Sequence, residues 1–262
     1  DMIRVIVSDI EGTLVPEATH DIDPELFCVI LELKEKGIQF AAASGRHWTS
    51  IDKFFAPVRD RIFYLADNGG YLGIHSRPLF VETIPQEAAL QFISDMKKIP
   101  DMEIVVSCPQ VTYLDSGNEE FCSWIKNGYL YDVEKVCDLR QIKDPITKVA
   151  CYSEKNQQEA YLQAQENYSS CGDVVISGAA WIDLMPSGVN KGRAVKVLQE
   201  SLNISPKETM VFGDQFNDVE MLEQAYYSFA VSDAREEVCR KARFLADKST
   251  EKGVLKVLKY LL

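Results

Sequence analysis

The sequence contains no apolar run that approaches the ~20 residues needed to cross a bilayer. Its first residues are apolar only briefly and then become acidic, unlike a secretory signal peptide. Basic residues nowhere form a patch, because the densest stretch, Arg235 to Arg243, is mixed with acids. These absences argue against membrane and nucleic-acid partners. We expect a cytoplasmic protein that acts on small molecules, as a monomer or weak homodimer.

The spacing of the cysteines and histidines does not indicate a zinc site, a redox motif or a catalytic triad. The seven cysteines are scattered, without a Cys-x-x-Cys pair or a histidine at zinc-binding spacing, so we expect reduced and mostly buried thiols. None of the three histidines has a serine or cysteine partner in a strand-turn-helix elbow, which leaves a catalytic triad unsupported. His47, directly after Arg46, is expected on the surface.

The formal net charge is −12 at pH 7. A protein this acidic must create a local positive site if its substrate is a phosphate. That requirement favours a metal ion together with one or two well-placed lysines or arginines.

Apolar periodicity indicates an α/β protein. Short apolar strands alternate with amphipathic helices near the beginning, at residues 3–7, 24–36, 38–43, 51–55 and 63–66. The same alternation returns near the end, at residues 191–202, 209–212, 218–224 and 227–231, before an amphipathic segment at 253–262 that we expect to pack on the core. This order is typical of a doubly wound, Rossmann-like parallel sheet.

The middle of the chain has a different rhythm. Its helices and strands follow the order α-β-β-α-β-α-β-β, with helices expected on one side of a mixed sheet. We therefore predict an inserted α+β cap domain at residues 83–186, within a core domain made of residues 1–82 and 187–262.

The first chemical motif follows the first strand, in VIVSDIEGTLV at residues 5–15. Asp9 ends that strand, at the sheet edge where open parallel sheets bind ligands. Glu11 lies two residues on and is expected to point to the same side. Gly12 and Thr13 permit a tight turn whose N–H groups are expected to face an oxyanion. One carboxylate can attack while its neighbour moves a proton.

Two further motifs suit an anion. Ser44 and Gly45 end the next strand of the core, and Arg46 is expected to begin a helix, which together make an anion site. Lys191 begins the helix that follows the insert, and its ammonium group suits a phosphoryl oxygen. A plain helix cap and a solvated lysine are the competing interpretations.

The last motif is MVFGDQFNDVEML, residues 210–222. Asp214 follows a buried strand, and Asn217 and Asp218 begin a helix. Carboxylate oxygens are the ligands that Mg²⁺ prefers, so Asp9 and Asp214 together predict a magnesium site.

In this order the motifs resemble the four motifs of the haloacid dehalogenase superfamily. The resemblance spans nearly the whole chain and implies that Asp9 is a nucleophile and metal ligand, with Glu11 as general acid and base. It implies metal binding by Asp9, the backbone carbonyl of Glu11, Asp214 and Asp218, the last acting through waters or Lys191. The phosphate-binding residues that it implies are Ile10, Ser44, Gly45, Arg46, Lys191 and Asn217.

The position of the insert is similar to the type-two cap of the Cof-like sugar-phosphate phosphatases. Only 34 residues lie between Asp9 and Ser44, too few for a folded insert there. Asn68-Gly69-Gly70 resembles that branch's N-G-[AG] turn. The departure is Glu11, where the branch normally carries aspartate; the added methylene shifts the carboxyl by about an ångström, which can cost ~10²-fold in rate.

We therefore expect a Mg²⁺-dependent phosphatase that hydrolyses small phosphorylated metabolites, sugar phosphates above all, through an aspartyl phosphate. The alternatives are a phosphotransferase or mutase of the same fold, and a catalytically weak phosphometabolite-binding protein because of Glu11. Substrate choice is expected to reside in the cap, where Trp124, Tyr129, Tyr131 and Trp181 are more often core residues than ligand contacts.

Overall fold

The computed structural model describes residues 2–262, which form two compact units. The first unit runs to Leu79 and resumes at Asn190, and the second is Phe80–Val189. Each border lies three residues from the one expected from the sequence. No helix among residues 2–262 is long and apolar enough to cross a membrane.

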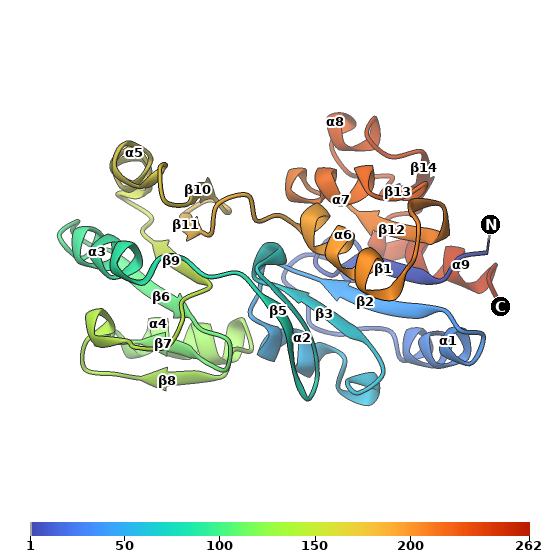
Figure 1. The fold of residues 1–262 in the computed structure, drawn as a ribbon, viewed down its shortest axis with the longest axis horizontal. Helices are drawn as coiled ribbons and strands as arrows, with labels where there is room; N and C mark the ends of the chain where they lie inside the picture. Colours follow the sequence, from blue (N-terminus) through green and yellow to red (C-terminus); the bar gives the residue numbers. More distant parts are fainter. Residues whose placement is uncertain (1) are drawn as a thin grey trace. The chain divides into compact units, whose positions relative to one another are not determined.

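The first unit is built on an eight-stranded sheet (Figure 1). Its strands, in spatial order, are β14 (Phe244–Ala246), β13 (Tyr227–Val231), β12 (Thr209–Gly213), β1 (Val5–Asp9), β2 (Gln39–Ala43), β3 (Phe63–Ala66), β4 (Tyr71–Ile74) and β5 (Arg77–Val81). The strands from β14 to β3 are all parallel, and β4 runs antiparallel to β3. Every residue of β1 and β12 is buried, which is why their sequences are almost continuously apolar.

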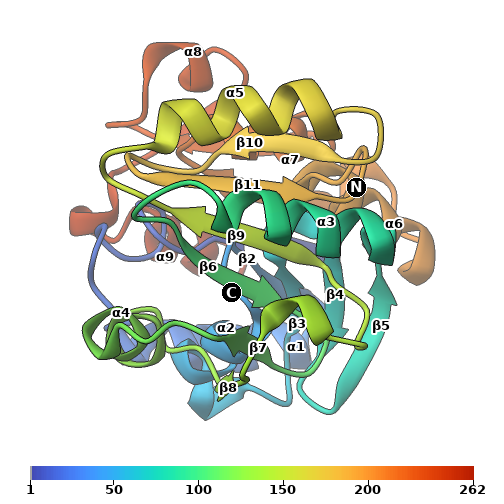
Figure 2. The same cartoon turned by 90° about the vertical axis from the view of Figure 1, so that its left-hand side faces the viewer.

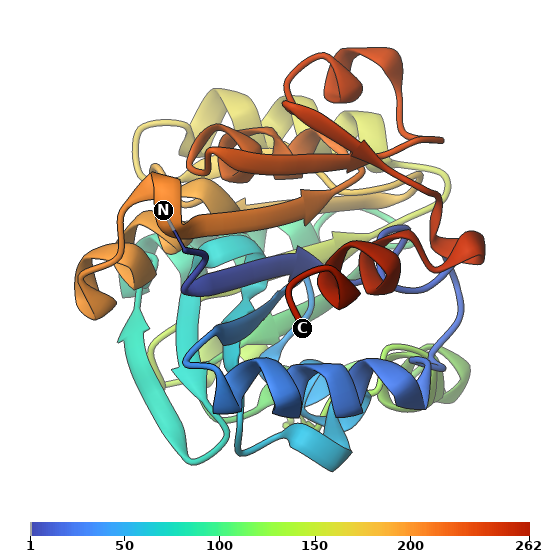
Figure 3. The same cartoon turned by 90° about the vertical axis from the view of Figure 1, so that its right-hand side faces the viewer.

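Helices cover both faces of this sheet. They are α1 (Pro24–Glu35), α2 (Trp48–Phe54), α6 (Lys191–Leu202), α7 (Val219–Glu223), α8 (Glu236–Cys239) and α9 (Gly253–Lys259). From β1 the chain winds one way to β2 and β3, and from β12 it winds the other way to β13 and β14. Because such crossovers are right-handed, α1 and α7 lie on opposite faces; α9 packs beside α1, as Figure 3 shows, and α6 packs beside α7. The predicted doubly wound parallel core is confirmed.

The second unit is an α+β fold on a six-stranded sheet. Its strands, in spatial order, are β10 (Asp173–Ile176), β11 (Trp181–Met185), β9 (Lys148–Tyr152), β6 (Glu103–Ser107), β7 (Thr112–Leu114) and β8 (Val133–Lys135). The long helices α3 (Gln86–Lys97) and α5 (Gln157–Tyr168) cover one face (Figure 2). The short helix α4 (Glu119–Ser123) packs with a second cluster, built around Val105, Ala150 and Phe121. Alternate residues of β6 and β9 enter the two clusters, as the pleat of a strand requires.

Most elements lie within two residues of their predicted ends, and Gly37, with a φ of +81°, follows the end of α1. Several short elements were not expected from the sequence: β4, β5, β8, α8 and β14. All helices of this unit were expected on one side of its sheet, whereas α4 packs with the second cluster. Tyr129, Tyr131 and Trp181 belong to that cluster, in accordance with a packing role. Trp124 is more exposed, and its ring contacts those of Tyr129 and Trp181. All seven cysteines are free, but only Cys108, Cys122 and Cys151 are buried, fewer than expected.

Candidate active site

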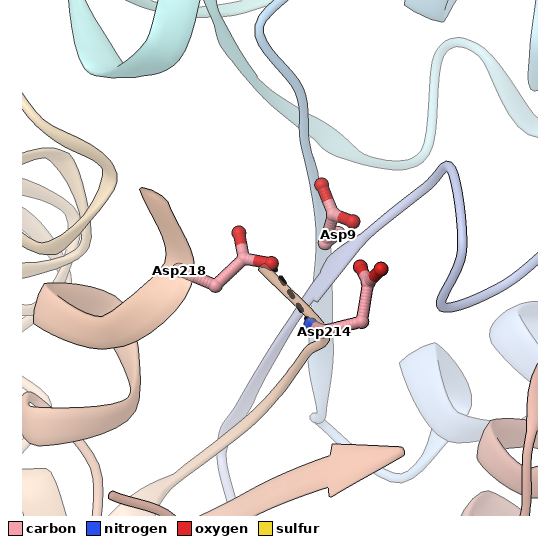
Figure 4. A group of neighbouring side chains, drawn as sticks. All are labelled: Asp9, Asp214 and Asp218. Atoms are coloured by element: carbon pink, nitrogen blue, oxygen red, sulfur yellow. Dashed lines mark hydrogen bonds between the residues drawn. The ribbon is translucent and has the colours of Figure 1, made fainter. Parts of the chain in front are cut away.

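The predicted chemical residues of the first unit meet where its winding direction reverses. Strand β1 pairs with β12 on one side and β2 on the other, so the carboxyl ends of β1 and β12 form the switch point of the sheet. Asp9 ends β1, and Asp214 directly follows β12. Figure 4 shows these two carboxylates side by side, with that of Asp218 opposite.

Lys191 is the cation of this cluster. It is the first residue of α6, after Asn190, whose side chain caps the helix by accepting a hydrogen bond from the N–H of Arg193. Its ammonium Nζ lies 2.6 Å from Oδ1 of Asp9 and 2.7 Å from Oδ1 of Asp218, with 1% of the residue exposed. Burial alone would lower the pKa of Lys191, but the charges of Asp218 and Asp9 outweigh burial and raise it. Lys191 is therefore a permanent cation at physiological pH.

Asp214 is joined to Asp9 through Thr13. The Thr13 hydroxyl lies 2.8 Å from Oδ1 of Asp214 and 3.3 Å from Oδ2 of Asp9. Gly12 also contacts Asp214, because a Cβ placed on Gly12 would stand 2.3 Å from Oδ2 of Asp214. The turn after β1 is thus fitted closely around the carboxylate that follows β12.

Asp218 organises the loop after β12. Its Oδ2 accepts hydrogen bonds from the backbone N–H groups of Asp214 at 2.9 Å and Gln215 at 3.1 Å, and its Oδ1 receives Lys191. The dashed line in Figure 4 marks the contact with Asp214. Both oxygens of Asp218 are therefore engaged, which suits a role in positioning Asp214 and Lys191.

The three carboxylates fit a divalent cation. Asp9, Asp214 and Asp218 offer oxygens that all lie within 4.8 Å of one another, and all three residues are buried. Burial first, and then the charge of Asp218, raise the pKa of Asp9 well above its ordinary range despite Lys191. Burial likewise raises the pKa of Asp214. Lys191 can balance the charge of only one of the three buried carboxylates, so a bound cation would offset the remaining negative charge. Carboxylate oxygens are ligands that Mg²⁺ prefers.

Glu11 points to the strand on the other side of β1. Its Oε1 forms an ion pair with Nε of Arg46, and its Oε2 accepts a hydrogen bond from the Ser44 hydroxyl at 3.3 Å. Glu11 lies two residues after Asp9, and its charge is the smallest of the contributions that raise the pKa of Asp9. Gly45 lies between Ser44 and Arg46, and the space that its Cβ would occupy is open.

Two residues predicted to bind phosphate form hydrogen bonds with other groups of the protein. Asn217 donates a hydrogen bond from Nδ2 to Oδ1 of Asn68 at 3.1 Å, which joins the loop after β12 to the turn after β3. Ile10 is fully buried, and its carbonyl accepts hydrogen bonds from the N–H groups of Thr13, Leu14 and Val15. Thr13 was expected only as part of the turn, so the contacts of its hydroxyl with Asp9 and Asp214 were missed. The capping role of Asn190 was also missed, although an asparagine directly before Lys191 was an available signal.

Three local expectations were wrong. The N–H groups of Gly12 and Thr13 were expected to face an oxyanion. Instead, Gly12 donates to the carbonyl of Val15 and Thr13 donates to the carbonyl of Ile10, so both groups are hydrogen-bonded within the turn. Helix α2 begins at Trp48, two residues after Arg46, because the His47 side chain accepts the N–H of Thr49 and caps the helix there. His47 is therefore buried, not on the surface.

Comparison with known proteins identifies the family of this chain. Residues 6–258 match the haloacid dehalogenase-like hydrolase family. The 5-amino-6-(5-phospho-D-ribitylamino)uracil phosphatase of Escherichia coli K12 is 26% identical over 260 residues, covering 98% of this chain and 95% of that protein.

Two solved structures are similar over their full extent. A crystal structure from Eubacterium rectale has a TM-score of 0.92 at 29% identity and covers 100% of both chains. A subclass IIB sugar phosphatase has a TM-score of 0.82 at 21% identity, covering 99% of this chain and 100% of its own, which shows the shared fold. The chain therefore belongs to the haloacid dehalogenase-like hydrolase family, and it is a phosphatase.

Proposed function

We propose that this phosphatase hydrolyses phosphate monoesters of small metabolites, sugar and sugar-alcohol phosphates above all, through a phosphorylated Asp9 with Mg²⁺ as cofactor. The observation that carries the proposal is the Asp9 carboxylate, buried at the carboxyl end of β1, 2.6 Å from Lys191 and beside Asp214. The substrate class is supported by the relative named for a phosphoribitylamino-uracil and by the sugar phosphatase of the same fold. By the family resemblance, the inserted unit would select among these substrates.

The reaction would proceed in two displacements. In the first, an oxygen of Asp9 attacks phosphorus, the ester P–O bond breaks, and Glu11, entering this step in its protonated form, gives the proton to the leaving oxygen. In the second, water attacks the phosphorus of the aspartyl phosphate, Glu11 takes a proton from that water, and the bond to Asp9 breaks. The products are an alcohol and inorganic phosphate, and both carboxyl groups return to their starting states.

The residues of this chain supply part of the positive charge that a dianionic substrate requires. Lys191 is fixed by Asp218 and is always charged, so it can offset negative charge on a phosphoryl oxygen. Asp9, Asp214 and the backbone carbonyl of Glu11 would hold the metal, with Asp218 at its waters. When bound, Mg²⁺ supplies charge that keeps Asp9 ionised and draws electron density from the phosphoryl group.

The test is phosphate release from a panel of sugar phosphates, sugar-alcohol phosphates and nucleotides. The protein with Mg²⁺ should hydrolyse members of the first two classes, and EDTA or Asp9→Asn should reduce turnover to background. Asp60→Asn is the matched control, because the Asp60 side chain is 69% exposed and contacts Arg61 alone among the ion pairs of residues 2–262. Binding without turnover by the wild-type protein, or full activity of Asp9→Asn, would contradict the proposal; transfer of phosphate to a hexose in place of water would identify a phosphotransferase.

A further inference from the structure

The Glu11 side chain forms close contacts with two residues that follow strand β2. Its carboxylate is held from two directions, by the guanidinium of Arg46 on Oε1 and by the Ser44 hydroxyl on Oε2. The side chains of Arg46 and Glu11 are only 14% and 23% exposed, so solvent screens this ion pair less than it screens a pair on the surface.

Arg46 is itself fixed along its length. Its backbone N–H donates to the Ser44 hydroxyl at 3.1 Å, and its carbonyl accepts the N–H of Asp67 at 2.9 Å. Its guanidinium carbon lies 5.4 Å from the centre of the Phe54 ring, within the range of a cation–π contact. A guanidinium held in this way is a rigid, planar cation, and its ion pair keeps the Glu11 carboxylate beside it, while the hydrogen bond from Ser44 restrains the other oxygen.

The position of Glu11 makes such a restraint useful. Glutamate has one more rotatable bond than the aspartate that the resemblance leads us to expect, so its carboxylate samples more positions unless it is held. Proton transfer needs the carboxylate within hydrogen-bond reach of the reacting oxygen. Arg46 contacts the ionised form of Glu11, which is the form that accepts the proton of the attacking water in the second displacement.

We propose that Arg46 is a positioning residue that adapts the longer Glu11 to this site, in place of the phosphate-binding role that its motif suggested. The inference rests on the proposed function, because the position of Glu11 matters only if a phosphate ester is turned over. Arg46 then acts on the rate through Glu11 and contributes little to the binding of the phosphoryl group.

A double-mutant cycle tests this assignment. Arg46→Met should lower kcat about 10²-fold in the wild-type background, the loss expected for a catalytic group displaced by an ångström. In the Glu11→Gln background the same substitution should lower kcat by less than about threefold, since the group being positioned can no longer exchange a proton. KM and the inhibition constant of inorganic phosphate should change by less than about threefold throughout.

The controls separate positioning from folding and from binding. Arg61→Met removes a half-exposed arginine of the same unit and should leave kcat unchanged. Arg46→Lys keeps the charge without the planar fork and should lose about tenfold in kcat; it takes the place of Arg46→Met in the cycle if that variant fails to fold.

A full 10²-fold loss in both backgrounds, or a rise of tenfold or more in the inhibition constant of phosphate, would show that Arg46 acts on the phosphate and would overturn the inference. A wild-type protein that releases no phosphate from any ester would instead overturn the proposed function, and with it the role of Arg46.

Discussion

Gly12 and Gly37 form a natural pair for testing how closely the turn after β1 is fitted to the metal-binding carboxylate. Both glycines have left-handed backbones, with φ of +80° and +81°. Nothing lies within 4 Å of the position that a Cβ on Gly37 would occupy, whereas a Cβ on Gly12 would stand 2.3 Å from Oδ2 of Asp214. Alanine at either position introduces the same backbone strain, but only Gly12→Ala also displaces Asp214.

The size of each effect follows from these geometries. A residue with a Cβ in the left-handed region costs about 1–2 kcal/mol, and both variants should lose that much stability. The contact at Gly12 is about 1 Å short of ordinary van der Waals separation, which begins at 3.4 Å. Asp214 must therefore move by about that distance, and a displacement of ~1 Å in an active site can reduce the rate ~10²-fold.

The assay compares the two variants with the wild type in urea denaturation, phosphate release and magnesium titration. We expect similar losses of unfolding free energy, with kcat/KM reduced about 10²-fold and the magnesium requirement raised in Gly12→Ala alone. If Gly12→Ala retained wild-type activity and magnesium dependence, the proposed fit between the turn and Asp214 would be wrong.

Two further predictions concern the charges of the site. Lys191→Met should lower the unfolding free energy of the metal-free protein by about 3–5 kcal/mol, because it leaves buried carboxylates without their cation. Lys241→Met breaks an exposed pair with Glu223 and should change the unfolding free energy by less than about 1 kcal/mol. Equal losses of the two variants in urea titrations would refute the buried pairing. Folding raises the pKa values of Asp9 and Asp214 above the ordinary 3.8. Between pH 3.8 and these raised pKa values, the folded protein therefore binds more protons than the unfolded chain. Its unfolding free energy in EDTA should consequently fall as pH rises above about 4. Asp9→Asn should flatten that decline in pH-dependent denaturation curves, and parallel curves for the two proteins would contradict the assignment.

The parts of this structure that could be predicted from the sequence are those governed by local pattern. The apolar run of β1 indicates a strand buried in the sheet, and the apolar face of α1 indicates a helix that packs on the core. The bounds of both elements were predicted to within two positions. Short edge strands such as β8 and β14 span three residues each, too few for a periodicity, and their pairing with a longer neighbour gives them their conformation.

The site was predictable as a set of residues but not as a set of contacts. Asp9 and Lys191 lie 182 positions apart, and only the family's order of motifs connected them. The ion pair between Arg46 and Glu11 was missed because Arg46 was assigned to the start of a helix. A buried His47 caps that helix instead, a choice that depends on packing around α2 and leaves no trace in residue type.

The most direct test of the account is to identify the phosphorylated residue. The protein is mixed with a substrate, quenched in acid during turnover, and treated with borohydride, which reduces an aspartyl phosphate to homoserine. Peptide mass spectrometry should then find homoserine at position 9, and unchanged aspartate at positions 214 and 218. Homoserine at either of those two positions, or its absence from position 9 during sustained phosphate release, would contradict the assignment of Asp9 as the nucleophile.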